Sequence, residues 1–132
     1  NLRQVALHLL RPYQTLAATK YFTSIVTAPP AKNRRQATSL EALGTLPDFS
    51  IYYGHYLADT VTCRKCGHTY TTHREKMTDV NIATELLSDA FTDCFDVALL
   101  ISADSDLVGP IQRVRLLFPD KRVVVVFPPA RH

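Results

Sequence analysis

The sequence predicts an α/β fold, a three-layer sandwich with a mostly parallel sheet between helices. Helix-like and strand-like segments alternate along the chain, and residues 97–101 and 123–127 are uninterrupted apolar runs. Such runs are typical of strands buried on both faces, as in parallel sheets. The length of 132 residues, with 46% hydrophobic and 20% charged residues, suits one globular domain.

The first half of the chain contains two predicted helices and two predicted strands. Apolar residues recur at helical spacing over residues 2–10, and Pro12 ends this helix because proline disfavours helical geometry in the residue before it. Residues 21–27 and 49–58 are rich in aromatic and β-branched residues, which predicts strands. Between them, residues 33–46 predict a helix with a basic first half.

The second half begins with residues 60–76, a polar, cysteine-containing segment that we interpret as an insert within the single domain. Thr78 is a suitable N-cap for the next helix, whose apolar stripe reaches Ala90. The strand at residues 97–101 follows, and residues 107–118 predict a fourth helix before the last strand. Strands and helices therefore alternate to the end of the chain.

Composition excludes several classes of protein. No apolar run approaches the roughly 18–20 residues of a membrane-spanning helix, and the N-terminus lacks the pattern of a signal peptide. Three cysteines do not make a secreted disulfide framework, so we expect a reducing cytoplasm. The net charge of +3 permits a polyanionic partner without requiring one. Because the chain opens inside a helix and not at a Met, we expect it to be N-terminally incomplete.

Three carboxylates are predicted to meet at one edge of the sheet. Asp104 and Asp106 follow the strand at residues 97–101, and Asp79 opens the helix that precedes it. Ligands of open parallel sheets bind beyond the carboxyl ends of the strands, and converging carboxylates repel one another unless a cation lies between them. Oxygen ligands suit Mg²⁺ or Mn²⁺, which activates water and neutralises charge on a phosphate.

A structural interpretation of the same acids is also open. Asp106 is well placed as an N-cap, with Leu107 as the first helical residue, and Asp79 in a first turn interacts favourably with the helix dipole. Asp104 has no such structural role in the sequence pattern. The functional prediction therefore depends most on Asp104.

Two motifs resemble the NYN domain, a family of the PIN-like nuclease group. The family pattern E-K-x-x-D-V-x-x-A is matched over residues 75–83, and its apolar strand ending S-x-D-S-D is matched over residues 98–107. Arg34-Arg35-Gln36 before a helix is also similar to the family. The resemblance covers residues 32–127 and implies a PIN-like fold that binds a divalent metal and cleaves RNA, either single-stranded or structured.

Carried over residue by residue, the resemblance implies that Asp79, Asp104 and Asp106 are catalytic and hold Mg²⁺ or Mn²⁺. The family has a further acid in a first strand, in a V-D-G-x-N motif, and nothing similar precedes Leu2. We therefore expect three carboxylates instead of four, and an exposed sheet edge that favours a homodimer. The alternative is a catalytically silent RNA- or protein-binding module that keeps the fold.

The Cys63-x-x-Cys66-Gly67 segment is typical of half a zinc knuckle. His68 and His73 are the nearest further ligands, which gives a local structural Cys₂His₂ site for Zn²⁺. We do not expect Cys94 to join them, because the helix from Asp79 spans roughly 22 Å. The alternatives are a hairpin with two free cysteines and a zinc-stabilised interaction domain.

Four basic residues precede the acidic edge and are predicted to contact RNA phosphates. They are Arg34, Arg35, Arg74 and Lys76.

Overall fold

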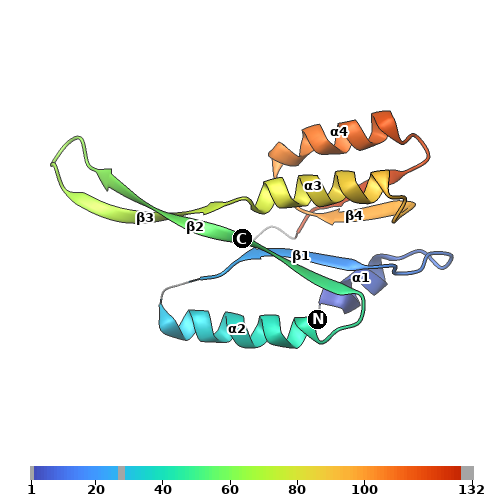
Figure 1. Cartoon of the computed structure of the whole chain (residues 1–132), viewed down its shortest axis with the longest axis horizontal. Coiled ribbons are helices and arrows are strands. Elements are labelled where there is room, and N and C mark those ends of the chain that lie inside the picture. Colours follow the sequence, from blue (N-terminus) through green and yellow to red (C-terminus); the bar gives the residue numbers. More distant parts are fainter. Residues whose placement is uncertain (1, 27–28, 129–132) are drawn as a thin grey trace. The chain divides into compact units, whose positions relative to one another are not determined.

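The structure, a computed structural model, describes residues 2–26 and 29–128, except for the side chains of His73 and Arg74. It confirms an α/β fold. In chain order the elements are α1 (Leu2–Leu9), β1 (Thr19–Ser24), α2 (Pro30–Gly44), β2 (Phe49–Thr62), β3 (Thr69–Lys76), α3 (Thr78–Phe91), β4 (Val97–Ile101), the 3₁₀ turn η1 (Ser105–Leu107), α4 (Val108–Leu117) and β5 (Arg122–Val126). The strands form two sheets, one ordered β1-β2-β3 and one made of β4 and β5 (Figure 1).

The chain divides into two compact units. One is Lys20–Asn81, and the other combines Asn1–Thr19 with Ile82–His132. None of the helices in the described ranges is both long enough and apolar enough to cross a membrane.

A long hairpin dominates the Lys20–Asn81 unit. β2 pairs antiparallel with β3, from the pair His55–Lys76 to the pair Thr62–Thr69, within a mixed sheet. The far part of the hairpin extends beyond β1 and α2, both of the same unit (Figure 1). The sequence predicted that the strand ends at residue 58, but β2 continues to Thr62. The polar segment at 60–76 therefore consists of the end of β2, the hairpin turn and β3.

Side chains at the start of α2 hold the end of β1. The backbone N–H of Val26 donates to Oε1 of Gln36 at 2.8 Å, and Nε2 of Gln36 donates to the carbonyl of Ser24 at 2.8 Å. Nδ2 of Asn33 donates to the carbonyl of Val26 at 2.6 Å. These bonds satisfy backbone groups where the strand pairing ends. Further along α2, Leu40 is buried and anchors the helix.

Gly54 lies where the sheet meets the start of α3. A Cβ atom at this position would lie 2.6 Å from the carbonyl oxygen of Lys76, 2.6 Å from Oγ of Ser24 and 2.7 Å from Oγ1 of Thr78. These distances are far inside van der Waals contact, so only glycine allows β2 to approach its neighbours this closely. The sequence predicted Thr78 as the N-cap of this helix, but α3 begins at Thr78 itself, and the Thr78 hydroxyl donates to Oε1 of Glu75 at 2.6 Å.

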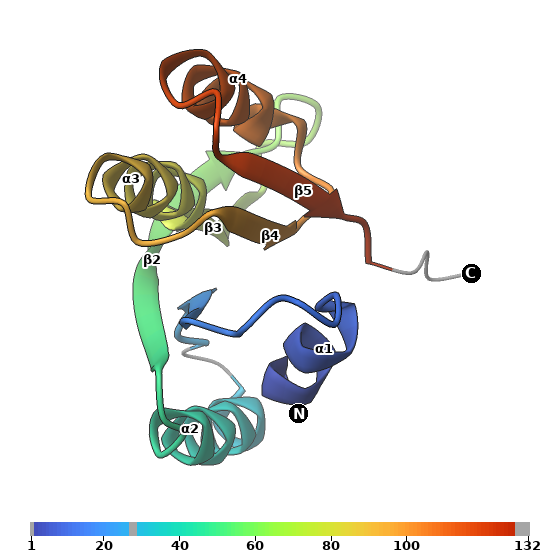
Figure 2. The same cartoon turned by 90° about the vertical axis from the view of Figure 1, so that its right-hand side faces the viewer.

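The second sheet consists of two parallel strands. β4 pairs with β5 in the register Val97–Arg122 to Ile101–Val126, as the sequence order strand–helix–strand requires. α4 contacts β5 (Figure 2), and the fully buried Val114 anchors it. The prediction that both strands are buried on both faces is wrong: most of their residues are half-buried, and Ile101 and Val124 are exposed.

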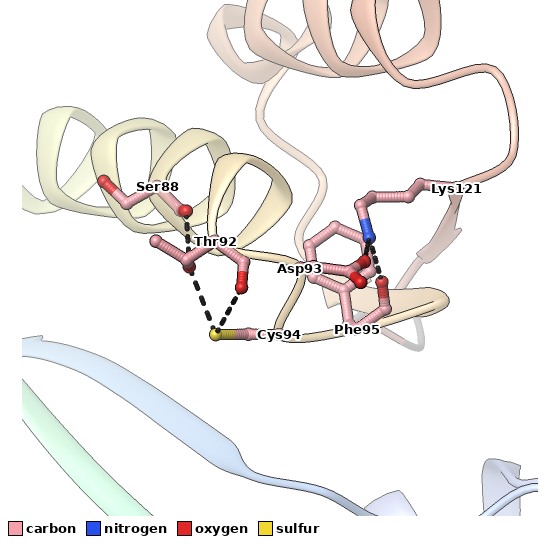
Figure 3. Close-up of polar contacts among 6 residues, drawn as sticks. All are labelled: Ser88, Thr92, Asp93, Cys94, Phe95 and Lys121. Carbon is pink, nitrogen blue, oxygen red and sulfur yellow. Dashed lines mark hydrogen bonds and ion pairs between the residues drawn. The ribbon is translucent and has the colours of Figure 1, made fainter.

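Lys121 fastens the turn after α3 to the start of β5 (Figure 3). Its ammonium forms an ion pair with Asp93 and donates to the carbonyl of Phe95 at 2.8 Å. It also lies 5.3 Å from the centre of the Phe95 ring, within cation–π range. Only 10% of the Lys121 side chain is exposed, against 86% for Asp93. The pairing lowers the pKa of Asp93 through the hydrogen bond and the positive charge of Lys121.

Gly54→Ala is expected to reduce the free energy of unfolding by about 3 kcal/mol, the upper end of the range for overpacked sites, because a backbone carbonyl is one of the obstructing groups. Gly44→Ala is the matched control, since nothing lies within 4 Å of a Cβ there. Urea denaturation of both variants measures the difference. Equal stability of the two variants would contradict the close approach.

Asp93→Asn is expected to lower the melting temperature at neutral pH. Asp93 has a left-handed φ of 57°, which Asn also tolerates, so the substitution removes charge without adding backbone strain. Because the folded pKa of Asp93 is lowered, its stabilisation is complete above the ordinary Asp pKa of about 4 and disappears as pH falls through the folded value. In thermal melts at decreasing pH, the melting temperature of the wild type should approach that of the variant. A constant difference would mean that the ion pair does not contribute.

Candidate functional site

The acidic candidates after β4 lie in a tightly bonded loop, residues 102–106. Oγ of Ser102 accepts the backbone N–H of Asp104 at 3.1 Å, and Oδ1 of Asp104 accepts the backbone N–H of Asp106 at 2.8 Å. The side chains of Ser102 and Asp104 thus each accept a backbone N–H two residues further along the loop. Leu107, only 2% exposed, then anchors the turn in the core.

The sequence predicted Asp106 as the N-cap. In the structure this role belongs to Asp104 instead. Asp104 is the N-cap of the 3₁₀ turn Ser105–Leu107, and α4 begins only at Val108. The predicted helix start at Leu107 placed the cap two residues too late, because this 3₁₀ turn lies between the strand and the helix. Ser102, which was not among the predicted site residues, orients Asp104 through its hydroxyl. Its position as the first residue of the S-x-D-S-D motif was the only sequence signal for this role.

Asp104 and Asp106 are therefore brought together at the carboxyl end of β4, and both are exposed. One carboxylate oxygen of Asp104, Oδ1, accepts the capping hydrogen bond, and the other oxygen is left for a ligand. Among the described residues, the carboxylate of Asp106 has no hydrogen-bond or ion-pair partner. The loop thus offers carboxylate oxygens, the ligands that hard divalent cations prefer.

Asp79 lies in the first turn of α3, within the Lys20–Asn81 unit. Nδ2 of Asn81 in the same turn donates to the carbonyl of Tyr53 at 3.3 Å, which holds this turn against β2. Among the side chains that the structure describes, which do not include His73, no three His, Cys, Asp or Glu residues are grouped so that they could hold a metal ion. The three-carboxylate site hence remains a prediction: Asp104 and Asp106 share one loop, and Asp79 belongs to the Lys20–Asn81 unit.

The two cysteines of the C-x-x-C motif form the turn of the β2–β3 hairpin. The N–H of Gly67 donates to the carbonyl of Cys63 at 2.9 Å, and the N–H of Cys63 donates to the carbonyl of His68 at 2.8 Å. Gly67 has a φ of 71°, a conformation that favours glycine. Backbone N–H groups of Lys65 and Cys66, together with the Cys66 thiol, donate to the Cys63 sulfur and lower the pKa of the Cys63 thiol. This arrangement favours the thiolate, the form that binds metals.

The two histidines relate differently to this turn. His68 belongs to it, and its ring lies nearly parallel to that of Tyr70, with centroids 6.5 Å apart. His73 pairs with Ala58, four residues along β3 from the last pair of the hairpin, which is about 13 Å at the rise of a strand. The structure therefore does not bring the backbone of His73 to the cysteine turn.

The third cysteine lies elsewhere. Cys94 follows α3 and contacts Thr92, whose Oγ1 is 3.2 Å from its sulfur (Figure 3).

The predicted RNA-contacting residues all belong to the Lys20–Asn81 unit. Arg34 and Arg35 are exposed in the first half of α2, and Lys76 is exposed at the end of β3. The backbone of Arg74 pairs with Leu57, and its side chain lies outside the described part of the structure.

Comparison with known protein families, with curated proteins and with solved structures finds no match for this chain.

Asp104→Ala is expected to reduce the free energy of unfolding by about 1 kcal/mol through loss of the cap, whereas Asp104→Asn keeps the acceptor and stays near the wild type. Asp106→Ala serves as the control, because its exposed side chain has no partner among the described residues. Chemical denaturation of the three variants compares them. A larger loss in Asp106→Ala than in Asp104→Ala would contradict the assignment of the cap.

Proposed function

We propose that this chain is a metal-dependent ribonuclease domain with a PIN-like, three-layer arrangement, acting in the cytoplasm. The observation that carries the proposal is the pair Asp104 and Asp106 at the carboxyl end of a parallel strand, with the Asp106 carboxylate exposed and unpartnered among the described residues. The NYN-like motifs around Asp79 and around this loop support the same function.

The donors of the loop fit a divalent cation. Mg²⁺ is usually bound through one or two carboxylates and keeps several waters, and the loop offers the free oxygen of Asp104 and the whole carboxylate of Asp106. Asp79 is the proposed third ligand. When bound, Mg²⁺ or Mn²⁺ supplies a water of lowered pKa and offsets charge on the scissile phosphate.

The chain's own residues supply position and charge. Ser102 and the cap of Asp104 fix the loop before any ligand binds, which lowers the entropic cost of orienting the reacting groups. Arg34, Arg35 and Lys76 are proposed to hold RNA phosphates, because exposed cations offset the repulsion between RNA and the acidic loop.

The test is cleavage of end-labelled single-stranded RNA with Mn²⁺ by the wild type, Asp104→Asn and Asp106→Asn. Both variants should lose cleavage by at least about 100-fold, since even residues that only support a metal ligand contribute 10–100-fold. Asp104→Asn keeps the cap, so its loss would not come from a disordered loop.

Asp120→Asn is the matched control, with the same change of charge in the same unit. Asp120 precedes β5 and so lies at the opposite end of the parallel pair from the acidic loop. It should cleave like the wild type. Cleavage that persists in Asp106→Asn would contradict the site. If the wild type and all variants bind RNA but none cleaves it, the result would favour the silent binding module instead.

A further inference from the structure

The turn of the β2–β3 hairpin carries a feature that the proposed nuclease function does not use. We propose that this turn is half of an intermolecular zinc site, in which Cys63 and Cys66 from each of two copies of the chain bind one Zn²⁺ through four thiolates. The partner is thus a second copy of this chain, joined to the first at the hairpin turn. This proposal is independent of the acidic loop and of RNA.

The turn already has the form of a two-cysteine zinc ligand. Backbone hydrogen bonds from Gly67 to Cys63 and from Cys63 to His68 close it, and the left-handed Gly67 lets the chain reverse directly after Cys66. The turn therefore presents both cysteines from one tight reversal of the chain, and two cysteines spaced C-x-x-C supply two of the four ligands of a tetrahedral zinc site.

The position of the turn allows a second molecule to approach. Strand pairing ends at Thr62–Thr69, and the turn lies at the far end of a hairpin that extends beyond β1 and α2 of its unit (Figure 1). Cys66 and the two residues before it are exposed. Two turns can therefore meet end to end without contact between the β1 and α2 elements of the two copies.

Four thiolates complete the site better than the histidines of the same chain. The backbone of His73 lies about 13 Å along the strand from the end of the hairpin. His68 would add only a third ligand, which leaves an open position of the kind found in catalytic zinc sites. Two C-x-x-C turns give the closed, four-coordinate set that is typical of structural zinc, with the soft ligands that zinc favours.

The charges of the turn fit this assembly. Arg64 and Lys65 lie between the cysteines and are exposed, so two copies place four positive charges around the metal. A zinc ion with four thiolates carries a net charge of −2, which these cations offset. Without the metal, the same cations repel one another, so the dimer should form only when zinc is bound.

The experiment is light scattering and native mass spectrometry of the whole 132-residue chain, under reducing conditions, with ZnCl₂ and then with EDTA. We expect a zinc-dependent dimer with one zinc per two chains, which EDTA returns to monomer. A monomer that binds one zinc, a dimer that survives EDTA, or a protein that binds no zinc would each overturn the proposal.

Single substitutions test which side chains bind the zinc ion. Cys63→Ser and Cys66→Ser should each abolish the zinc-dependent dimer, while His68→Ala should keep it. Cys94→Ser is the matched control, an exposed cysteine outside the turn, and should also keep it. Circular dichroism without zinc checks that the variants fold like the wild type. Loss of the dimer in His68→Ala or Cys94→Ser, or its persistence in Cys63→Ser, would contradict the four-thiolate site.

Discussion

The arrangement of the Lys20–Asn81 unit depends on the close backbone approach at Gly54. At this position β2 has no side chain, and the carbonyl of Lys76 and the hydroxyls of Ser24 and Thr78 occupy the space. The end of β3 and the first residue of α3 are therefore fixed against the middle of β2. The hairpin turn lies at one end of the paired strands β2 and β3, and the first turn of α3, which carries Asp79, begins at the other end.

The junction between β3 and α3 shows how local conformation serves this approach. Met77 has a φ of 74°, uncommon for a residue with a side chain, and it is the single residue between β3 and α3. The hydroxyl of Thr78, the first residue of α3, donates to Glu75 at the end of β3. The strand and the helix are thus joined by one residue, which leaves little freedom in where Asp79 lies within its unit.

The sequence predicted best those elements whose apolar residues reveal burial. The apolar run at 97–101 became β4 with the same bounds, and the helix predicted over 107–118 became Val108–Leu117. β3 was predicted only through the alternative of a hairpin with two free cysteines, because Thr69–Lys76 is polar and mostly exposed. Its order comes from backbone pairing with β2, and hydrophobic periodicity cannot reveal a strand that buries no apolar face.

The candidate site was predicted in place but not in detail. The motif located the loop after β4, yet spacing alone could not distinguish a helix that starts at Leu107 from a 3₁₀ turn followed by α4, so Asp104 and Asp106 exchanged roles. Asp79 was placed by a rule for the strand ends of one parallel sheet, but it belongs to the unit that contains the mixed sheet. Sequence order therefore predicted the position of the loop that carries Asp104 and Asp106 better than the grouping of the three acids.

The two proposed metal positions offer donors of different chemical type. The acidic loop offers only oxygen donors, from Ser102, Asp104 and Asp106, whereas the hairpin turn offers sulfur from Cys63 and Cys66. Thiolates select zinc, and carboxylates with water suit Mg²⁺ or Mn²⁺, so neither position competes strongly for the other's ion. The ion at the turn would then decide whether two copies meet, and the ion at the acidic loop would decide whether a phosphodiester is cleaved. Because the donors differ in chemical type, each of these steps can be changed without changing the other.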